Sequence, residues 1–215
     1  GENSGEQFGS FTSISDDGNI VAIANTNSVV KIFQKNNTVW EQLGSDIVFN
    51  TYIQSISING DGSKVAIGLY DGNIIIYQYN VDNWIQMGGE ILLPESSQNG
   101  VNSVSINNLG NIIAIGVPGN DENGYSSGIT TCFIFSNNSW NQLGQDIYGQ
   151  STGDFSGCSV SLSDSGNILA IGSHRNTDNG LDAGHVRVYE LNFNSESSYE
   201  WIQMGENIEG NALEQ

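Results

Sequence analysis

The sequence predicts an all-β protein made of four repeats of one unit, and three observations lead to that prediction. A short alternating strand, a tight turn and a second apolar strand occur at 8–24, 53–68, 101–116 and 155–172. The pattern Trp-x-Gln-(Leu/Met)-Gly follows each of them and contains every tryptophan of the chain. Nowhere do apolar residues recur at the spacing of a helix. Repeats of about 40–50 residues with four strands each indicate a β-propeller, in which one repeat forms one blade.

The first repeat justifies each strand in turn. Ser10–Ser15 alternates its side chains as a strand does. The turn Asp16–Asn19 contains a glycine, which can adopt a positive φ. Ile20–Ala24 is an almost continuous apolar run, which suits a strand covered on both faces. The third strand is expected at Val29–Gln34 and the fourth at Trp40–Leu43, so that each blade is an antiparallel sheet of four strands.

The other three repeats follow the same course, and we expect one domain over 1–215. Its blades are expected at about 8–47, 53–91, 101–147 and 155–208. A β-sandwich is the alternative, but it would not carry a tryptophan at one fixed point of every unit. The glycines are expected in the hairpin turns, and the indoles are expected as wedges at the outer rim between blades. These structural residues are Gly18, Gly62, Gly110, Gly166, Trp40, Trp84, Trp140 and Trp201.

Each first strand carries Ser-x-Ser, as at Ser13 and Ser15. Small side chains of this kind suit a strand that lines the crowded axis of a propeller. The two cysteines, Cys132 and Cys158, fall on expected strands and lack the spacing of metal ligands. Both are expected to be buried core thiols.

The charge balance excludes some classes of partner. The chain has 5 Lys+Arg against 24 Asp+Glu, a net charge of −19. Such a field repels phosphate backbones and anionic membrane surfaces, so no nucleic-acid partner is expected. No apolar run of about 18 residues is present, so no membrane insertion is expected either. The polar opening of the chain lacks a signal peptide, which indicates that a leader was removed or that the sequence is an excerpt.

The fourth repeat carries a family resemblance. It contains Phe155-Ser156-Gly157, then Ser159–Ser163, Ala170–Gly172 and Gly184–Tyr189 (GHVRVY), followed by WIQMG. The combination resembles a propeller repeat of large secreted or surface proteins of marine bacteria and algae. It is more distantly similar to the FG-GAP repeats of the integrin α-subunit propeller. The resemblance covers nearly the whole chain, and it implies an extracellular or cell-surface location and an adhesive, recognition or structural role.

One feature of the integrin-type repeat is missing. Those repeats bind calcium in the first hairpin through a loop of the form D-x-D-x-D-G-x-x-D. The hairpin turns here are shorter and hold at most two carboxylates each. Because Ca²⁺ takes about six to eight oxygen ligands, the calcium site is not carried over to these turns.

The loops between the second and third strands of a repeat vary most. They are long at 117–128 and 173–184, where Asp, Asn and Gly are the residues of tight turns and also of weak calcium sites. No cofactor is expected apart from such a Ca²⁺, and its candidate ligands are Asp121, Glu122, Asp178 and Asp182. The candidate binding residues are Asn120, Asp121, Glu122, Tyr125, Asn176, Asp178, Asp182 and His185.

No catalytic constellation stands out, and the sequence predicts that the chain is not an enzyme. We expect a non-catalytic extracellular structural or adhesive module that self-assembles into oligomers or filaments. A ring of four blades could close on itself with adjacent termini, or its ends could continue into another chain, giving a homo-oligomer or a head-to-tail polymer. The alternative is a lectin-like module that binds a glycan or protein through the long loops, with Tyr70 and Tyr125 as contacts.

Overall fold

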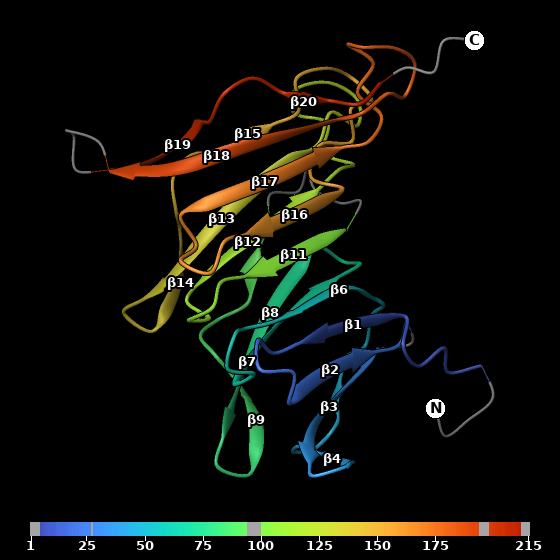
Figure 1. The fold of residues 1–215 in the computed structure, drawn as a ribbon, viewed down its shortest axis with the longest axis vertical. Helices are drawn as coiled ribbons and strands as arrows, with labels where there is room; N and C mark the ends of the chain where they lie inside the picture. Colours follow the sequence, from blue (N-terminus) through green and yellow to red (C-terminus); the bar gives the residue numbers. More distant parts are fainter. Residues whose placement is uncertain (1–4, 27, 94–99, 194–197, 212–215) are drawn as a thin grey trace.

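The computed structural model describes residues 5–26, 28–93, 100–193 and 198–211. This part of the chain is all β and forms four antiparallel sheets, one per repeat (Figure 1). It contains no helix that is long and apolar enough to cross a membrane. The fold is a β-propeller of four blades, as the sequence predicts.

The first sheet has four strands in chain order and a short fifth. They are β1 (Phe11–Ile14), β2 (Ile20–Ala24), β3 (Val29–Asn36), β4 (Val39–Gln42) and β5 (Ile47–Val48). Neighbouring strands pair in an antiparallel manner, and β5 pairs with β3 beyond the end of β4.

The other sheets repeat this arrangement. The second consists of β6 (Ile53–Ile58), β7 (Lys64–Leu69), β8 (Asn73–Asn80), β9 (Asn83–Gln86) and β10 (Ile91–Leu92). The third consists of β11 (Ser103–Ile106), β12 (Ile112–Val117), β13 (Ile129–Ser136), β14 (Ser139–Gln142) and β15 (Ile147–Tyr148). The fourth consists of β16 (Ser159–Leu162), β17 (Ile168–Ser173), β18 (His185–Phe193), β19 (Tyr199–Gln203) and β20 (Ile208–Glu209).

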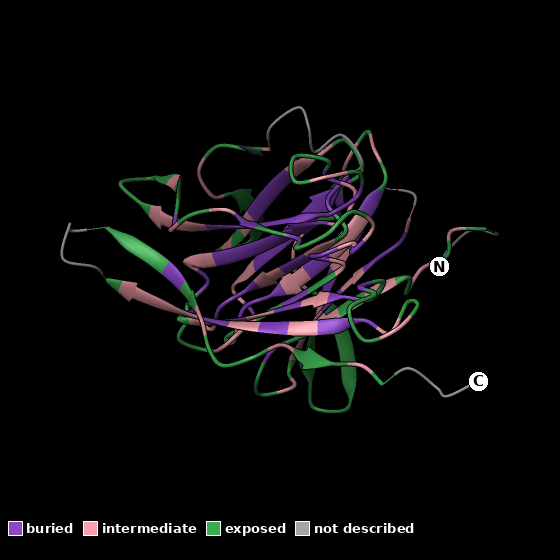
Figure 2. Ribbon diagram, turned by 90° about the horizontal axis from the view of Figure 1, so that it is seen from above, coloured by how far each residue is buried: buried purple, intermediate pink, exposed green. Residues whose placement is uncertain are grey.

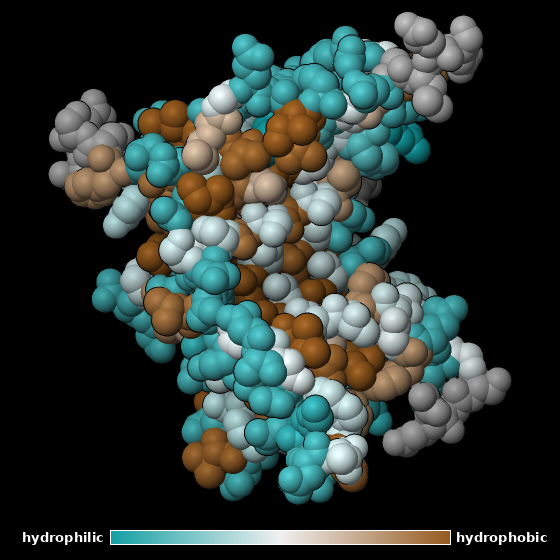
Figure 3. Space-filling view, in the orientation of Figure 1, coloured by the Kyte–Doolittle hydropathy of each residue, from teal (hydrophilic) through white to brown (hydrophobic). Residues whose placement is uncertain are grey.

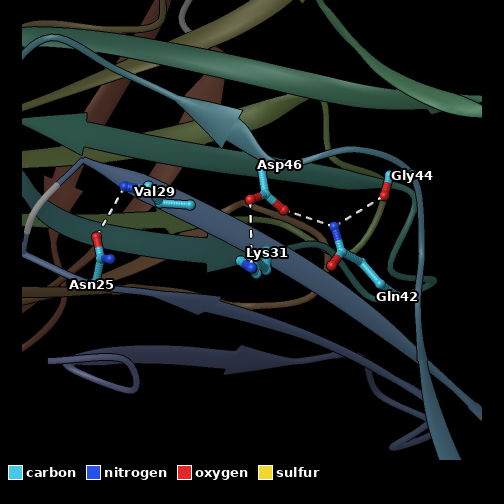
Figure 4. Close-up of polar contacts among 6 residues, drawn as sticks. All are labelled: Asn25, Val29, Lys31, Gln42, Gly44 and Asp46. Atoms are coloured by element: carbon cyan, nitrogen blue, oxygen red, sulfur yellow. Dashed lines mark hydrogen bonds and ion pairs between the residues drawn. The ribbon is translucent and has the colours of Figure 1, made fainter. Parts of the chain in front are cut away.

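The short fifth strand is a difference from the expected four-stranded blade, and the glutamine of the tryptophan pattern explains it. After β4 the chain bulges away and then returns to β3. Gln42 holds the bulge, since its Nε2 donates to the carbonyl oxygen of Gly44 and to Oδ1 of Asp46 (Figure 4). Asp46 also forms an ion pair of 3.5 Å with Lys31. At the other end of β3, the Asn25 side chain accepts a hydrogen bond from Val29 N (Figure 4).

The sheets stack side by side through their first strands. In turn, β1 packs against β6, β6 against β11, and β11 against β16. The first and fourth sheets lie at opposite ends of the row (Figure 1), and no contact of comparable extent joins them among the described residues. The four blades therefore form an open arc, and the alternative in which they close into a ring of four does not hold.

The core lies between the sheets, where the buried strands are purple in Figure 2. Each of three apolar clusters draws its residues from two adjacent sheets. Ile32 and Ile67, for example, meet in the first cluster and are both fully buried. Cys132 is a buried thiol, as expected. Cys158 is only half-buried, and its Sγ–H donates to the carbonyl oxygen of Gly172.

Three of the four tryptophans fix the junctions between sheets. Each indole N–H donates to a main-chain carbonyl of the preceding sheet: Trp84 to Leu43 at 2.8 Å, Trp140 to Met87 at 3.0 Å and Trp201 to Leu143 at 2.9 Å. The glycine after each acceptor leaves room for the ring. A Cβ at Gly44, for instance, would lie only 2.9 Å from Cδ1 of Trp84. This contact gives the pattern Trp-x-Gln-(Leu/Met)-Gly its physical reason.

Two further hydrogen bonds recur at each junction, near the propeller axis. A serine of each first strand accepts from an amide of the next: Ser13 from Ile58, Ser57 from Ile106 and Ser105 from Leu162. A hairpin turn also donates to the next turn: Asp16 N to Gly60 O, Gly60 N to Asn108 O and Asn108 N to Asp164 O. The serines therefore do more than keep the centre uncrowded, because they join consecutive blades.

Candidate functional site

The two long loops lie at the same end of the sheets, toward the upper right of Figure 1. Each is built around one buried asparagine. The Asn120 side chain accepts from Glu122 N at 3.0 Å, and the Asn176 side chain accepts from Asp178 N at 3.1 Å. A second asparagine ties each loop down, since Nδ2 of Asn123 donates to the carbonyl oxygen of Gly149, at 2.6 Å. In these loops Asn and Asp act first as turn formers.

The predicted calcium ligands take separate partners. Asp121 Oδ1 accepts from Ser126 N at 2.7 Å, and Asp178 accepts from the Asn176 side chain at 3.2 Å. Glu122 accepts from the hydroxyl of Tyr148 at 2.8 Å, and this bond raises the pKa of Tyr148 to about 12.

Asp182, the fourth candidate, lies in the loop before β18 with a positive φ of 51°. Within the described part of the chain, no three His, Cys, Asp or Glu side chains gather where a metal ion could be held. The structure therefore does not bring the four carboxylates together.

A buried polar cluster lies between the third and fourth sheets, beneath these loops. Of its members, only His185 is among the binding residues that the sequence predicts. Four buried side-chain atoms in it have no hydrogen-bond partner among the described residues: Thr130 Oγ1, Ser173 Oγ, His185 Nε2 and Arg187 Nε. Unpaired buried polar atoms are rare in native proteins and call for water, an ion or a ligand.

Arg187 is the charge at the centre of this cluster. It is 4% exposed, and its Nη2 donates to Tyr148 O at 2.8 Å and to Ser156 Oγ at 2.9 Å. The guanidinium carbon also lies 5.7 Å from the centre of the Tyr189 ring. No carboxylate of the described residues forms an ion pair with it. Within the described residues, the direct contacts of this cation are therefore a carbonyl, a hydroxyl and a ring face.

His185 lies beside it on the same face of β18, and is also 4% exposed. Its Nδ1 is 3.5 Å from Nδ2 of Asn207. Burial, and then the charge of Arg187, lower the pKa of His185, while Glu209, Asp154 and Asp178 act in the opposite sense. The imidazole is therefore neutral at physiological pH and can donate or accept through Nε2.

Asp154 links the cluster to the loop above it. This carboxylate is 1% exposed, accepts from the amides of Gln150 and Ser151, and accepts from Nδ2 of Asn176. The alternation in GHVRVY could have shown that His185 and Arg187 share one face of a strand. Thr130 belongs to another blade, and no pattern in the sequence indicates that it is part of this cluster.

Exposed aromatic side chains stand in the long loop 117–128 and beside the ends of β6 and β7 in the second sheet. Tyr125 is 74% exposed, and Tyr52 and Tyr70 form an edge-to-face pair with ring centres 6.3 Å apart. In the fourth sheet, the guanidinium of Arg175 lies 4.7 Å from the centre of the Phe155 ring. Both tyrosines that the sequence suggests as glycan contacts are therefore accessible to solvent.

Comparison with known proteins shows the fold and no family. No protein-family model matches the chain, and no curated protein is significantly similar to it in sequence. One solved structure with the same fold is a protein from Bacteroides uniformis described provisionally as a 6-phosphogluconolactonase. Its TM-score is 0.65 at 12% identity over 93% of this chain. A chain of a mitotic checkpoint complex matches over 84% with a TM-score of 0.56 at 19% identity. This chain spans only 54% and 47% of the length of these two.

The first match corrects one prediction. The sequence predicts that the chain is not an enzyme, and this exclusion is wrong. A protein with the same fold over 93% of this chain is described as an enzyme. A propeller without a recognised catalytic motif is therefore not excluded from catalysis. The resemblance to FG-GAP repeats stays a prediction, since neither match bears on it.

Proposed function

We propose that this chain is a structural β-propeller module that joins further propeller blades through its two end sheets. One observation carries the proposal: the junction that is repeated three times inside the molecule is left open at both ends. Trp84 and Trp201 are 6% and 2% exposed, whereas Trp40 is 44% exposed and its indole has no acceptor among the described residues.

Apolar side chains at both ends are exposed where their counterparts are covered. Ile58 and Ile106 are 6% and 7% exposed, whereas Ile14, at the same position of the first sheet, is 58% exposed. At the other end Ile208 is 61% exposed, whereas its three counterparts, Ile47, Ile91 and Ile147, are 4–5% exposed. Figure 3 shows apolar side chains at the surface around β1 and β2 and around β17 and β18. Exposed apolar faces of this kind favour association.

The native mass in solution tests this function. Light scattering over a range of concentrations should give particles heavier than the single chain of 23.1 kDa. A single-chain mass at every concentration up to about 100 µM, a range that covers weak association, would contradict the proposal. An extracellular or cell-surface location and an adhesive role go with it as predictions.

A second candidate function is glycan or protein binding at the rim of long loops. The exposed pair of Tyr52 and Tyr70 and the exposed Tyr125 favour it, because aromatic rings can stack on sugars. A glycan array with and without a chelator tests it, using Tyr70→Ala and Tyr125→Ala. Tyr199→Ala is the matched control, since Tyr199 is 49% exposed on β19, away from these loops. Binding that survives both rim substitutions would exclude this site.

A further inference from the structure

We infer that a second copy of this chain covers both end sheets, and that two copies close into one ring of eight blades. The inference rests on the proposed function and names its partner, its contacts and its stoichiometry. It follows from the chemistry of the two open faces and from the extent of the arc.

The fourth sheet carries one of the two partner groups of each junction hydrogen bond. The carbonyl of Met204 stands where Leu43, Met87 and Leu143 accept from an indole, and it has no partner among the described residues. Ser161 occupies the position of the junction serines, and its hydroxyl is likewise without a partner there. The amide of Asp164 corresponds to the turn amides that donate at the three junctions, and it makes no main-chain bond of this kind within the described part of the chain.

The first sheet offers the three complementary groups. They are the indole N–H of Trp40, the amide of Ile14 and the carbonyl of Asp16. In an antiparallel sheet, hydrogen-bonded residue pairs alternate with pairs that are not hydrogen bonded. Ser15 and Ile20 form a hydrogen-bonded pair, so the adjacent pair of Ile14 and Val21 does not, and the Ile14 amide points away from β2. Each open donor at one end therefore has an open acceptor at the equivalent position of the other end.

Shape agrees with this pairing. A Cβ built at Gly205 would meet no atom of the described residues within 4 Å, whereas one at Gly144 would lie 2.7 Å from Cδ1 of Trp201. Gly205 thus leaves the space that an indole fills at the internal junctions. Met204, 46% exposed, and Ile208 border that space and would cover the apolar ring of Trp40 from a second copy.

The two faces are complementary to each other and not to themselves. Such heterologous contacts give a ring if the rotation closes and a filament if it does not. The four blades match 54% and 47% of two larger chains of the same fold, so the arc covers about half of such an assembly. Two copies of four blades supply eight, which is within the observed range of about four to eight blades per propeller. Because this chain covers about half of each of the two larger chains, we expect one further copy to close the ring.

The charge sets the conditions for association. Each copy carries a net charge of −19, and the carboxylates of Asp16 and Asp164 would approach each other at the new junctions. Salt screens such repulsion over about 10 Å at 0.1 M. The dimer should therefore be tighter at high than at low ionic strength, the reverse of an association driven by opposite charges.

The test is the mass of the whole chain and of three variants by light scattering, with electron microscopy of the particles. The expected mass is twice 23.1 kDa, about 46 kDa, and the expected image is a closed ring. Trp40→Ala and Ile208→Asp should each give single chains, because each change damages both junctions of the ring. Tyr125→Ala, a matched aromatic change at the loop rim, should leave the dimer intact.

Mixing the two defective variants gives the sharpest result. An equal mixture of Trp40→Ala and Ile208→Asp contains one undamaged junction per pair, so dimers should reappear. Single chains under all conditions would overturn both the inference and the proposed function. Filaments or larger rings would leave the proposed function standing and overturn the dimer. A dimer that is indifferent to Trp40→Ala would overturn the assigned contacts.

Discussion

The junction between the first and second sheets and the junction between the third and fourth share one backbone plan and differ in what fills it. In both, an indole N–H donates a hydrogen bond to a main-chain carbonyl, and a serine hydroxyl accepts one from a main-chain amide. The first is filled by apolar side chains such as Ile32, Ile67 and Ile75. The third places Arg187 and other polar groups at the end near the long loops, four of them with unpaired atoms.

This difference separates the residues that recur in every repeat from those that vary between repeats. The residues that recur in every unit build the junctions, and at the three internal junctions their hydrogen-bonding groups are satisfied within the chain. The residues that vary between units place chain-specific chemistry at the loop end of a sheet. Arg187 stands where the second sheet has Ile75, and His185 stands where it has Asn73. Any ligand chemistry particular to this chain is therefore expected at the third junction.

The largest expected effect tests the shared part of the junctions. Trp201→Ala removes an indole that is 2% exposed together with its hydrogen bond, and should lower the free energy of unfolding by about 3–5 kcal/mol. Trp40→Ala, the same change at an exposed position, should cost about 0.5 kcal/mol or less in the single-chain state. Urea unfolding at low protein concentration measures both. Similar losses would show that the internal junctions are no stronger than an open end.

The next largest effect on stability compares two equivalent glycines, Gly116 and Gly172, near the ends of the second strands of the third and fourth sheets. A Cβ at Gly116 would lie 2.1 Å from the carbonyl oxygen of Gly157, whereas one at Gly172 would meet nothing closer than 3.6 Å. Gly116→Ala should therefore destabilise the fold by about 1–3 kcal/mol through overpacking of the junction. Gly172→Ala faces no following sheet within the chain and should be close to neutral. Thermal unfolding of the two variants decides this, and equal melting temperatures would contradict the packing described.

A smaller effect tests the polar filling of the third junction. Arg187→Met makes this position resemble Ile75 of the first junction. Because the buried guanidinium has no carboxylate partner among the described residues, its apolar replacement should leave the unfolding free energy unchanged or raise it by about 1–2 kcal/mol. A large loss in chemical denaturation would show that Arg187 is held by stronger interactions than the bonds to Tyr148 and Ser156.

Much of the fold follows from the sequence because its determinants are local. The alternation in the first strands and the turn glycines act within a few residues, so the four strands of each blade could be placed. The fifth strand could not, since Ile47–Val48 is too short to show a period. The open arc could not be predicted either, because the angle between successive sheets depends on packing across a junction, which no pattern within one repeat encodes.

The candidate site was predicted only in part, for a related reason. Asp121 and Asn176 have the composition of both a turn and a cation site, and only their hydrogen bonds show that they serve the turn. His185 and Arg187 lie on one strand, so alternation places them together. Thr130 belongs to the preceding sheet and faces Gly157 of the fourth repeat, and that neighbourhood exists only once the sheets are stacked.

The smallest expected effect is a pH dependence that belongs to the third junction alone. The pKa of His185 is lowered from 6.5 by burial and by Arg187, against the opposing charges of Glu209, Asp154 and Asp178. The unfolded chain therefore takes up the proton first as the pH falls below 6.5, so stability is complete above that value. It should then decline by at most about 1.4 kcal/mol per pH unit until the folded protein is protonated as well.

His185→Asn is the matched variant, since Asn73 occupies the same position in the second sheet. Unfolding free energies of the two proteins, measured from pH 7.5 to pH 5, should diverge on the acid side, with the wild type losing more. Carboxylates such as Asp61, whose pKa is lowered from 3.8, titrate below this window and are common to both proteins. Parallel curves would mean that the imidazole titrates as freely in the folded chain as in the unfolded one. In that case the polar filling of the third junction would be open to solvent, unlike the apolar filling of the first.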